Sequence, residues 1–274
     1  MLRAMGLRVW TPAVRHAVAL PEPEPETEQT AASEPVGARS AALAAPAPQV
    51  VARPPSATSA TSAPPANGAV AAMDWDALRE AVAGCRACAL CDSRTQTVFG
   101  VGHRRAHWMV VGEAPGEQED RIGEPFVGAA GQLLDRMLAA LNLTRADDGT
   151  APPSQRVYIA NTLKCRPPRN RNPLAEEVAQ CEPYLVRQIE LLRPRLILAM
   201  GRFAVQSLLR SDEPIGRLRG RVHRYQGVPL VVTYHPAYLL RNLPDKAKAW
   251  EDLCLAASVA EAAAEAEGER DSAA

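Results

Sequence analysis

The sequence has no long hydrophobic run and no excess charge of either sign. The 274-residue chain contains no stretch of 18 apolar residues, which excludes a transmembrane helix of ordinary length. Its first residues also lack a continuous apolar segment, because Arg8 and Arg15 interrupt it. A secretory signal peptide is therefore not expected, and we expect a cytoplasmic protein that has no membrane partner.

The zero net charge hides an uneven distribution along the chain. The 31 basic and 31 acidic residues balance overall, and residues 1–72 are balanced as well. From Lys246 to the C-terminus there are three basic and seven acidic residues, so residues 73–245 carry a surplus of four positive charges. This surplus is compatible with a nucleic-acid partner without demanding one, since basic surfaces are often only solvated.

Residues 1–72 contain few large apolar side chains. They are rich in Ala, Pro, Ser, Thr and Glu, and they include the run PEPEPETE. Such a segment cannot bury enough apolar surface to offset the entropy lost on ordering, so we expect a disordered extension. The alternative is that translation starts at Met73 and that the upstream residues are not part of the protein.

From residue 74 onward the chain alternates short apolar runs with helical patterns. Asp74 is placed to cap a short helix, WDALREAVAGC. Apolar runs at 107–112, 156–161, 195–200 and 229–234 are continuous, as in strands buried on both faces of a parallel sheet. Helical stretches at 129–143, 173–192 and 202–209 lie between them, and an Ala-rich helix begins near Lys246. We predict a three-layer α/β/α sandwich with a central four-stranded, mostly parallel sheet, forming one domain over 73–260, followed by an acidic Ala-rich tail over 261–274.

Polar segments rich in Gly and Pro follow each predicted strand. They read GEAPGEQED, NTLKCRPPRNRNP, GRFA and HPAYLLRN in chain order. Because the carboxyl ends of parallel strands share one edge of a sheet, these segments are predicted to converge on one site. Ordinary connecting turns are the alternative, but turns rarely combine a His, several Asn and a cluster of carboxylates.

Six cysteines without a secretory signal favour metal or cluster ligation over a disulfide framework. Cys85 and Cys88 form a CxxC pair, whereas Cys165 and Cys181 are separated by fifteen residues. Four thiolates suit zinc or an iron–sulfur cluster, and the wide second spacing favours a cluster. Cys91 is an alternative to Cys88, and we interpret Cys254, inside the Ala-rich helix, as a small core residue.

The chain resembles the family 4 uracil-DNA glycosylases, the iron–sulfur members of the uracil-DNA glycosylase superfamily. The matching segments are CRACALC before VFGVG, then GEAPGEQED, GEPFVGAAGQLLD, NTLKCRPPRNRNP with the later Cys181, and YHPAYLLRN. The resemblance covers about residues 74–252. The resemblance implies uracil-containing DNA as substrate, and hydrolysis of the N-glycosidic bond to leave an abasic site in base excision repair. It also implies a structural 4Fe-4S cluster on Cys85, Cys88, Cys165 and Cys181. We expect the protein to act as a monomer.

A pocket for a flipped uracil needs an aromatic face and groups that read the base edge. Phe126 is the candidate face. Asn161 can both donate to O4 and accept from N3–H, a role that the resemblance also assigns to it. His235 is predicted to donate to O2, where negative charge develops as uracil leaves. We expect backbone amides of Glu113 and Ala114 to line the pocket, together with Pro115.

The residue that activates water is the part of the site that the resemblance identifies least clearly. Ala114 stands where the best-known superfamily members carry Asp, a departure that family 4 shares. We therefore expect Glu113 or Glu119 to orient the water or stabilise the cationic sugar, with Asn170 supporting that loop. Gly116 replaces the Tyr that excludes thymine in other members, so Glu119 or Phe126 must shape that exclusion.

DNA contacts are predicted from two segments. Lys and Arg side chains meet phosphates, and an apolar wedge fills the gap that a flipped base leaves. The wedge is predicted to be Leu239 or Leu240. The predicted phosphate contacts are Lys164, Arg166, Arg169, Arg171 and Arg241.

Two other functions fit parts of the pattern. One is covalent capture of uracil through a His in a basic insert after the second strand, but the segment CRPPRNRNPLAEE has neither a His nor an insert. The other is a non-catalytic nucleic-acid-binding module with a four-cysteine zinc site.

Overall fold

The computed structural model describes residues 67–272, so most of the predicted N-terminal extension lies outside the described residues. Five strands form one sheet: β1 (Trp108–Gly112), β2 (Val157–Asn161), β3 (Leu196–Met200), β4 (Val222–Tyr225) and β5 (Val228–Thr233). The helices are α1 (Asn67–Ala71), α2 (Trp75–Ala83), α3 (Glu117–Ile122), α4 (Ala129–Ala139), α5 (Ala175–Leu192), α6 (Arg202–Leu209), α7 (Ile215–Leu218), α8 (Pro236–Arg241) and α9 (Asp245–Ser272). Three short 3₁₀ turns complete the set: η2 (Ala89–Asp92), η3 (Pro153–Gln155) and η4 (Pro168–Asn170).

The sheet has the strand order β2-β1-β3-β5-β4. The first four strands in this order are parallel, and β4 pairs antiparallel with β5. The prediction of a mostly parallel sheet is confirmed, but the expected number of four strands is wrong. The missed strand, β4, lies at the edge and alternates exposed and half-buried residues (VHRY), so it lacks the continuous apolar run of the central strands.

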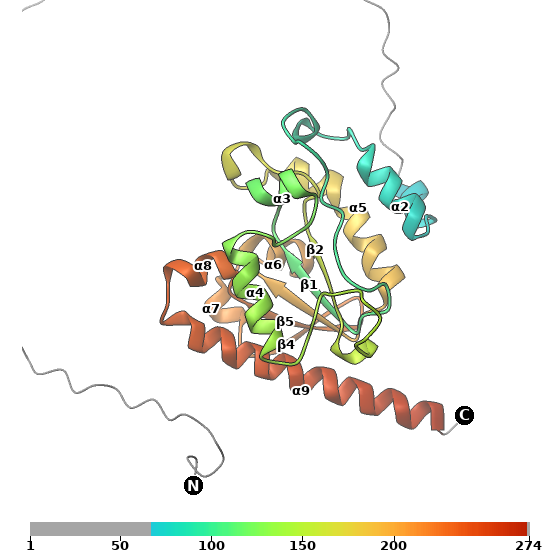
Figure 1. Cartoon of the computed structure of the whole chain (residues 1–274), viewed down its shortest axis with the longest axis vertical. Coiled ribbons are helices and arrows are strands. Elements are labelled where there is room, and N and C mark those ends of the chain that lie inside the picture. Colours follow the sequence, from blue (N-terminus) through green and yellow to red (C-terminus); the bar gives the residue numbers. More distant parts are fainter. Residues whose placement is uncertain (1–66, 273–274) are drawn as a thin grey trace, which may run out of the picture. The chain divides into compact units, whose positions relative to one another are not determined.

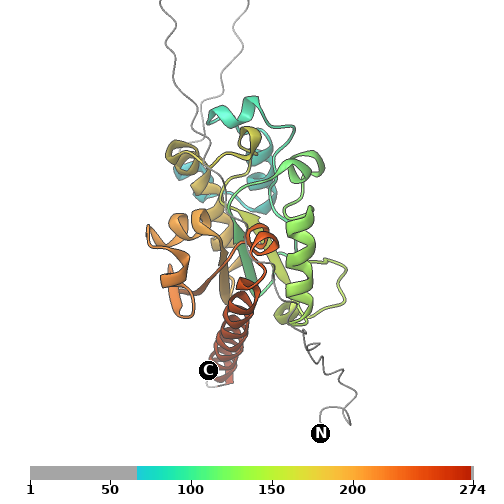
Figure 2. The ribbon, with the colours of Figure 1, turned by 90° about the vertical axis from the view of Figure 1, so that its left-hand side faces the viewer.

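Helices cover both faces of the sheet, as the three-layer prediction requires. Side chains on one face, such as Met109 and Val111, pack with α5 and α6. Their neighbours Trp108 and Val110 point to the other face and pack with α4 and α9. Successive residues of a strand point to opposite faces, so a strand buried on both sides must be apolar throughout. Figures 1 and 2 show the strands between these two helical layers.

The segment before β1 is anchored by α2 and by the first helix. The Asp74 side chain caps α2 as predicted, accepting from the amides of Asp76 at 3.1 Å and Ala77 at 2.9 Å. Val70 of α1 is buried in the same cluster as Leu78. Order therefore begins before Met73, because an apolar residue of the expected extension contributes to the core.

The C-terminal helix corrects one sequence interpretation. Helix α9 begins at Asp245, close to the predicted start, and it includes residues 261–272 of the expected tail. Cys254 is exposed on this helix and is not a core residue, because Leu253 and Ala256 provide the face that packs on the sheet. Within the described residues, no helix is both long and apolar enough to span a membrane.

Candidate active site

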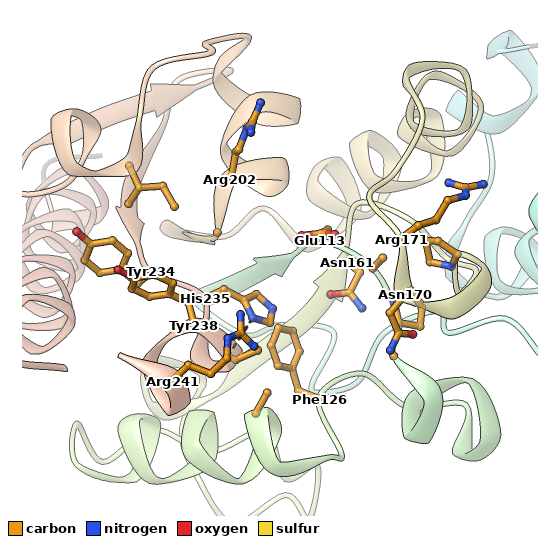
Figure 3. Close-up of a pocket in the computed structure, with 18 of the residues that line it drawn as sticks. Glu113, Phe126, Asn161, Asn170, Arg171, Arg202, Tyr234, His235, Tyr238 and Arg241 are labelled. Atoms are coloured by element: carbon orange, nitrogen blue, oxygen red, sulfur yellow. Dashed lines mark hydrogen bonds between the residues drawn. The ribbon is translucent and has the colours of Figure 1, made fainter. Parts of the chain in front are cut away.

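The carboxyl ends of β1, β2, β3 and β5 meet at a cavity of about 950 Å³. The convergence predicted from the strand-end segments is therefore confirmed. Glu113 follows β1, Asn161 ends β2, Gly201 follows β3 and His235 follows β5, and all four residues line this cavity. Figure 3 shows Asn161, Phe126 and His235 facing a common space.

Asn161 brings an unsatisfied polar atom to the cavity. The residue is 2% exposed, and its side-chain Oδ1 has no hydrogen-bond partner. Buried polar atoms in folded proteins nearly always have a partner, and an exception requires an explanation such as a ligand. Asn161 is therefore prepared to accept a hydrogen bond from a group that enters the cavity.

Phe126 and His235 form the aromatic part of the site. Their rings are stacked with centroids 5.4 Å apart and an interplanar angle of 29°. Phe126 has a left-handed backbone with φ of 55°, which costs a non-glycine residue on the order of 1–3 kcal/mol. Gly112 makes room for this ring, because a Cβ at that position would lie 2.7 Å from Phe126 Cζ.

Glu119 holds the loop that carries Phe126. Its Oε1 accepts from the amides of Val127 at 2.9 Å and Gly128 at 3.0 Å, and its Oε2 accepts from Gly116 at 3.1 Å. The two oxygens thus accept from backbone amides that come before Phe126 (Gly116) and after it (Val127 and Gly128). These contacts hold the loop that contains the strained backbone at Phe126, so Glu119 positions this loop. The expected contact of Glu119 with water stays a prediction.

Glu113 differs from Glu119 because no group in residues 67–272 hydrogen-bonds to its carboxylate. It is half-buried at the cavity wall, and burial raises the pKa of its carboxyl group above the usual range. A dehydrated carboxylate without partners is suited to holding a water molecule or a developing positive charge.

The tautomer of His235 follows from its hydrogen bonding. The Ala237 amide donates to His235 Nδ1 at 3.2 Å, so Nδ1 carries no proton and Nε2–H is the donor of the neutral ring. Burial lowers the pKa of His235 to about 4. The imidazole is therefore neutral at pH 7 and presents one N–H.

Several predicted DNA contacts are corrected by burial. Lys164 is 1% exposed, and its Nζ donates to the Asn161 carbonyl at 2.8 Å and to Gln188 Oε1 at 2.7 Å. It cannot reach a phosphate, and it supports the strand end that carries Asn161. Leu239 is 1% exposed and belongs to the core, whereas Leu240 is 42% exposed. Leu240 is therefore the leucine available as a wedge.

The predicted arginines differ in how far they are committed to protein partners. Arg171 forms a two-point contact with Glu177 at 2.9 and 2.5 Å, and Arg166 donates to Asn170 Oδ1 at 2.8 Å. Asn170 lines the cavity, as expected for a residue that supports this loop. Arg169 and Arg241 are exposed, and Arg241 also lines the cavity.

Five cysteines surround a second, small cavity, which is lined by Cys85, Cys88, Cys91, Cys165 and Cys181. Arg94 donates to Cys165 Sγ at 2.9 Å, and the Lys164 amide donates to Cys181 Sγ at 3.3 Å. Burial raises the pKa of Cys165 to about 11 and of Cys181 to about 12. As free thiols these two groups are neutral at pH 7, and as thiolates they would need a bound metal group to offset the cost of burying their charge.

No three His, Cys, Asp or Glu side chains in the described part of the chain converge closely enough to hold a single metal ion. The thiols gather around one space without closing on one point. In a 4Fe-4S cluster each thiolate binds a different iron, so the four sulfurs lie farther apart than around one zinc ion. The thiol donor set and the N–H groups directed at sulfur fit a 4Fe-4S cluster.

Comparison with known proteins agrees with the fold. Residues 99–254 match the family model of the uracil DNA glycosylase superfamily, so the chain belongs to that superfamily. It is 46% identical over 173 residues to a type-4 uracil-DNA glycosylase of Archaeoglobus fulgidus, covering 60% of this chain and 82% of that protein. A type-4 enzyme of Pyrobaculum aerophilum is 42% identical, with 67% and 93% covered, and one of Thermotoga maritima is 41% identical, with 60% and 81% covered. Within the superfamily, the chain is a family 4 member.

Sequence reasoning missed several residues that build the site. Tyr234 and Tyr238 line the cavity, and they lie on either side of His235 in a segment where only His235, Leu239, Leu240 and Arg241 received roles. Glu177 is buried and binds Arg171 as well as the Leu174 amide. In the sequence, Glu176 and Glu177 look like an ordinary exposed acidic pair in the first turn of a helix. The contact of Glu177 with Arg171 could not be predicted, because it depends on how the loop before α5 folds back.

Proposed function

We propose that the protein removes uracil from DNA by hydrolysing the N-glycosidic bond, which leaves an abasic site for base excision repair. The observation that carries this proposal is the unpartnered, buried Oδ1 of Asn161 in a cavity shared with Phe126 and His235. A flipped base stacks on Phe126 and presents its edge to Asn161. We expect a monomer that acts in the cytoplasm.

Asn161 supplies the recognition of uracil. Uracil N3–H donates to Oδ1, and the Asn161 amide donates to O4. Cytosine presents an acceptor at N3 and a donor at C4, the reverse of this pattern, so its contacts with the amide are repulsive. A site built to pair with one edge discriminates strongly against an analogue that leaves buried polar groups unpaired.

His235 assists departure of the base. As the glycosidic bond breaks, negative charge develops on uracil O2, and the Nε2–H of neutral His235 donates to that oxygen. The ring needs no reorganisation, because the Ala237 amide already fixes its tautomer. Preorganised donors of this kind contribute on the order of 2.7–4 kcal/mol to stabilisation of a transition state.

Glu113 is our candidate for handling the water and the cationic sugar. It is the partner-free carboxylate at the cavity wall, whereas the oxygens of Glu119 hold loop amides. A Glu113→Gln substitution should slow single-turnover excision by about 100-fold or more, in the range of general-base effects. Full activity in this variant would exclude Glu113 from the chemistry.

We further propose that Cys85, Cys88, Cys165 and Cys181 hold a 4Fe-4S cluster. When bound, the cluster supplies a structural crosslink between the segment before β1, the loop after β2 and helix α5. Protein purified without oxygen should be brown with a broad visible absorption band. Cys165→Ser should remove the band, whereas Cys254→Ser, on exposed α9, should keep it. A colourless protein that contains zinc would contradict the cluster.

The activity is tested with labelled oligonucleotides that differ at one base. Purified protein is incubated with strands containing uracil, cytosine or thymine, alone or in duplex, and then treated with alkali, which breaks the strand at an abasic site. Cleavage at uracil alone is expected. Absence of cleavage in both single and double strands would favour a non-catalytic DNA-binding module.

A further inference from the structure

The cavity extends past the groups that contact uracil. Its volume of about 950 Å³ lies at the upper end of the usual range for small-molecule sites, roughly 300–1,000 Å³, and exceeds what one pyrimidine fills. Beyond His235 the lining continues with Tyr234, Tyr238 and Arg241. Figure 3 shows the two tyrosines on the side of His235 away from Asn161.

The local backbone explains why the tyrosines face away from uracil. Tyr234 and His235 directly follow β5, which ends at Thr233, and the backbone at His235 is extended. Side chains of consecutive residues in an extended chain point to opposite sides, and Tyr234 accordingly lies on the other side of His235 from Asn161 (Figure 3). Tyr238 lies in α8 and places its ring against Tyr234.

The tyrosine rings belong to a layered stack with a buried anchor. The two centroids are 5.1 Å apart with an interplanar angle of 20°, and the Arg219 guanidinium lies 6.0 Å from the Tyr234 centroid. Arg219 Nε donates to Asp252 Oδ2 at 3.1 Å, and Asp252 is fully buried. Tyr238 thus packs against the Tyr234 ring, which also contacts a cation held in place by Asp252.

The edge of the Tyr238 ring is also fixed. Its hydroxyl donates to Asp245 Oδ2 at 2.6 Å, and Asp245 forms an ion pair with Lys248 at 2.8 Å. Tyr238 is half-buried and lines the cavity. A ring held at its face and its edge loses little entropy when a ligand stacks on it.

Flipping uracil out of a strand creates a need that this ring can meet. The nucleotide beside uracil loses its stacking partner, and an aromatic side chain can replace that partner regardless of which base it is. We propose that Tyr238 is a stacking platform for the nucleotide adjacent to uracil in the same DNA strand. This inference rests on the proposed uracil excision and extends it to the neighbouring nucleotide.

The charges around Tyr238 suit this ligand. Arg241 lies three residues farther along α8, and its exposed side chain is available for the phosphate of the stacked nucleotide. Asp212 and Glu213 also line the cavity; Asp212 accepts from Gln206 at 2.8 Å, and Glu213 pairs with Arg221 at 3.7 Å. These carboxylates disfavour phosphate on their part of the wall.

The test uses 2-aminopurine, whose fluorescence is quenched by stacking, next to 2′-fluoro-2′-deoxyuridine, whose glycosidic bond resists hydrolysis. The probe is placed on the 5′ side in one single-stranded oligonucleotide and on the 3′ side in another. On binding wild-type protein, one of the two should remain quenched. Tyr238→Ala should release that quenching and weaken binding by about 5- to 100-fold, the range for one base–aromatic stack.

Two further variants separate stacking from stability. Tyr238→Phe keeps the ring without the Asp245 hydrogen bond and should retain quenching. Tyr238→Leu keeps an apolar contact with Tyr234 but has no aromatic face, and it should behave like the alanine variant.

Wild-type quenching and affinity in folded Tyr238→Ala or Tyr238→Leu, at both probe positions, would overturn the inference. Failure of the proposed function would look different, because wild-type protein would then leave ordinary uracil in the strand.

Discussion

Gly112 offers a way to disturb the base-binding groups without altering any of them. It is the last residue of β1, and a methyl group there would lie 2.5 Å from Asn161 Oδ1 and 2.7 Å from Phe126 Cζ. Both atoms belong to side chains that line the cavity. A Gly112→Ala substitution therefore displaces the Asn161 side-chain amide and the Phe126 ring from their present positions.

The size of the effect follows from these distances. Carbon atoms pack best at about 3.5–4.0 Å, so each side chain must move by about 1 Å. Displacement of this size in a positioning group costs on the order of 100-fold in rate, and overpacking costs about 1–3 kcal/mol of stability. We expect kcat/KM for uracil excision to fall by about 100-fold and Tm to fall by roughly 2–12 °C.

Single-turnover excision from a uracil-containing single strand, well below Tm, measures the catalytic effect separately from stability. Gly68→Ala is the matched control, because a methyl group on Gly68 of α1 meets no atom within 4 Å. If Gly112→Ala folds and excises uracil within threefold of wild type, then Asn161 and Phe126 do not make the contacts that we assign to them.

Three further predictions use the charges and burial of the site. Because burial raises the pKa of Glu113 and its anion is the active form, kcat/KM should fall with decreasing pH already above the ordinary carboxyl range. Glu113→Gln should remove this dependence from the pH–rate profile, and an unchanged profile would count against the assignment. Leu240→Ala should slow excision from duplex DNA by about 10-fold, in line with the burial of one leucine, and should affect single strands much less; equal effects on both would argue against a wedge. Lys164→Met leaves the Asn161 carbonyl and Gln188 Oε1 without their buried donor, at about 1–3 kcal/mol each, so it should lower Tm. It should not change the salt dependence of DNA affinity, whereas a decrease of about one in the slope of that dependence would restore Lys164 as a phosphate contact.

The lowered pKa of His235 also makes the stability of the folded protein depend on pH. Its pKa is about 4 in the folded state against a usual value of 6.5, so the unfolded chain binds more protons between these values. The resulting stabilisation is complete above about pH 6.5 and is lost as the pH falls toward 4. The Tm difference between wild type and His235→Gln, followed from pH 7 to pH 4, should shrink accordingly. A constant difference would mean that His235 is not dehydrated.

The sequence predicted those features that depend on local pattern. Continuous apolar runs identified the central strands because both faces of the sheet are covered, and strand-end motifs predicted the cavity because parallel strands end together. Edge strand β4 escaped because its alternating, half-exposed residues do not differ from those of a loop. These successes and this failure have one cause, which is that burial on two sides leaves a clear signal and burial on one side leaves a weak one.

Individual side-chain roles were harder to predict, because they depend on distant partners. In the sequence, Lys164 is one basic residue of an Arg-rich loop, but in the structure it is buried and donates to Gln188 on α5. Glu119 reads as a candidate for water activation, yet its oxygens bind three loop amides. Residue type and strand position gave the right neighbourhood in both cases, but only the three-dimensional contacts separate a residue that touches substrate from one that holds the site together.

The central claim is that Asn161 reads uracil in a cavity where the base is excised. The most direct measurement is single-turnover excision by wild type and Asn161→Ala, in parallel, from strands that contain one uracil, with the fold of each protein confirmed by its melting curve. We predict that wild type releases uracil and that the variant is slower by at least ~100-fold, because a site that pairs with a base edge depends on those bonds. Equal rates in the two proteins, or no release by wild type, would contradict the account.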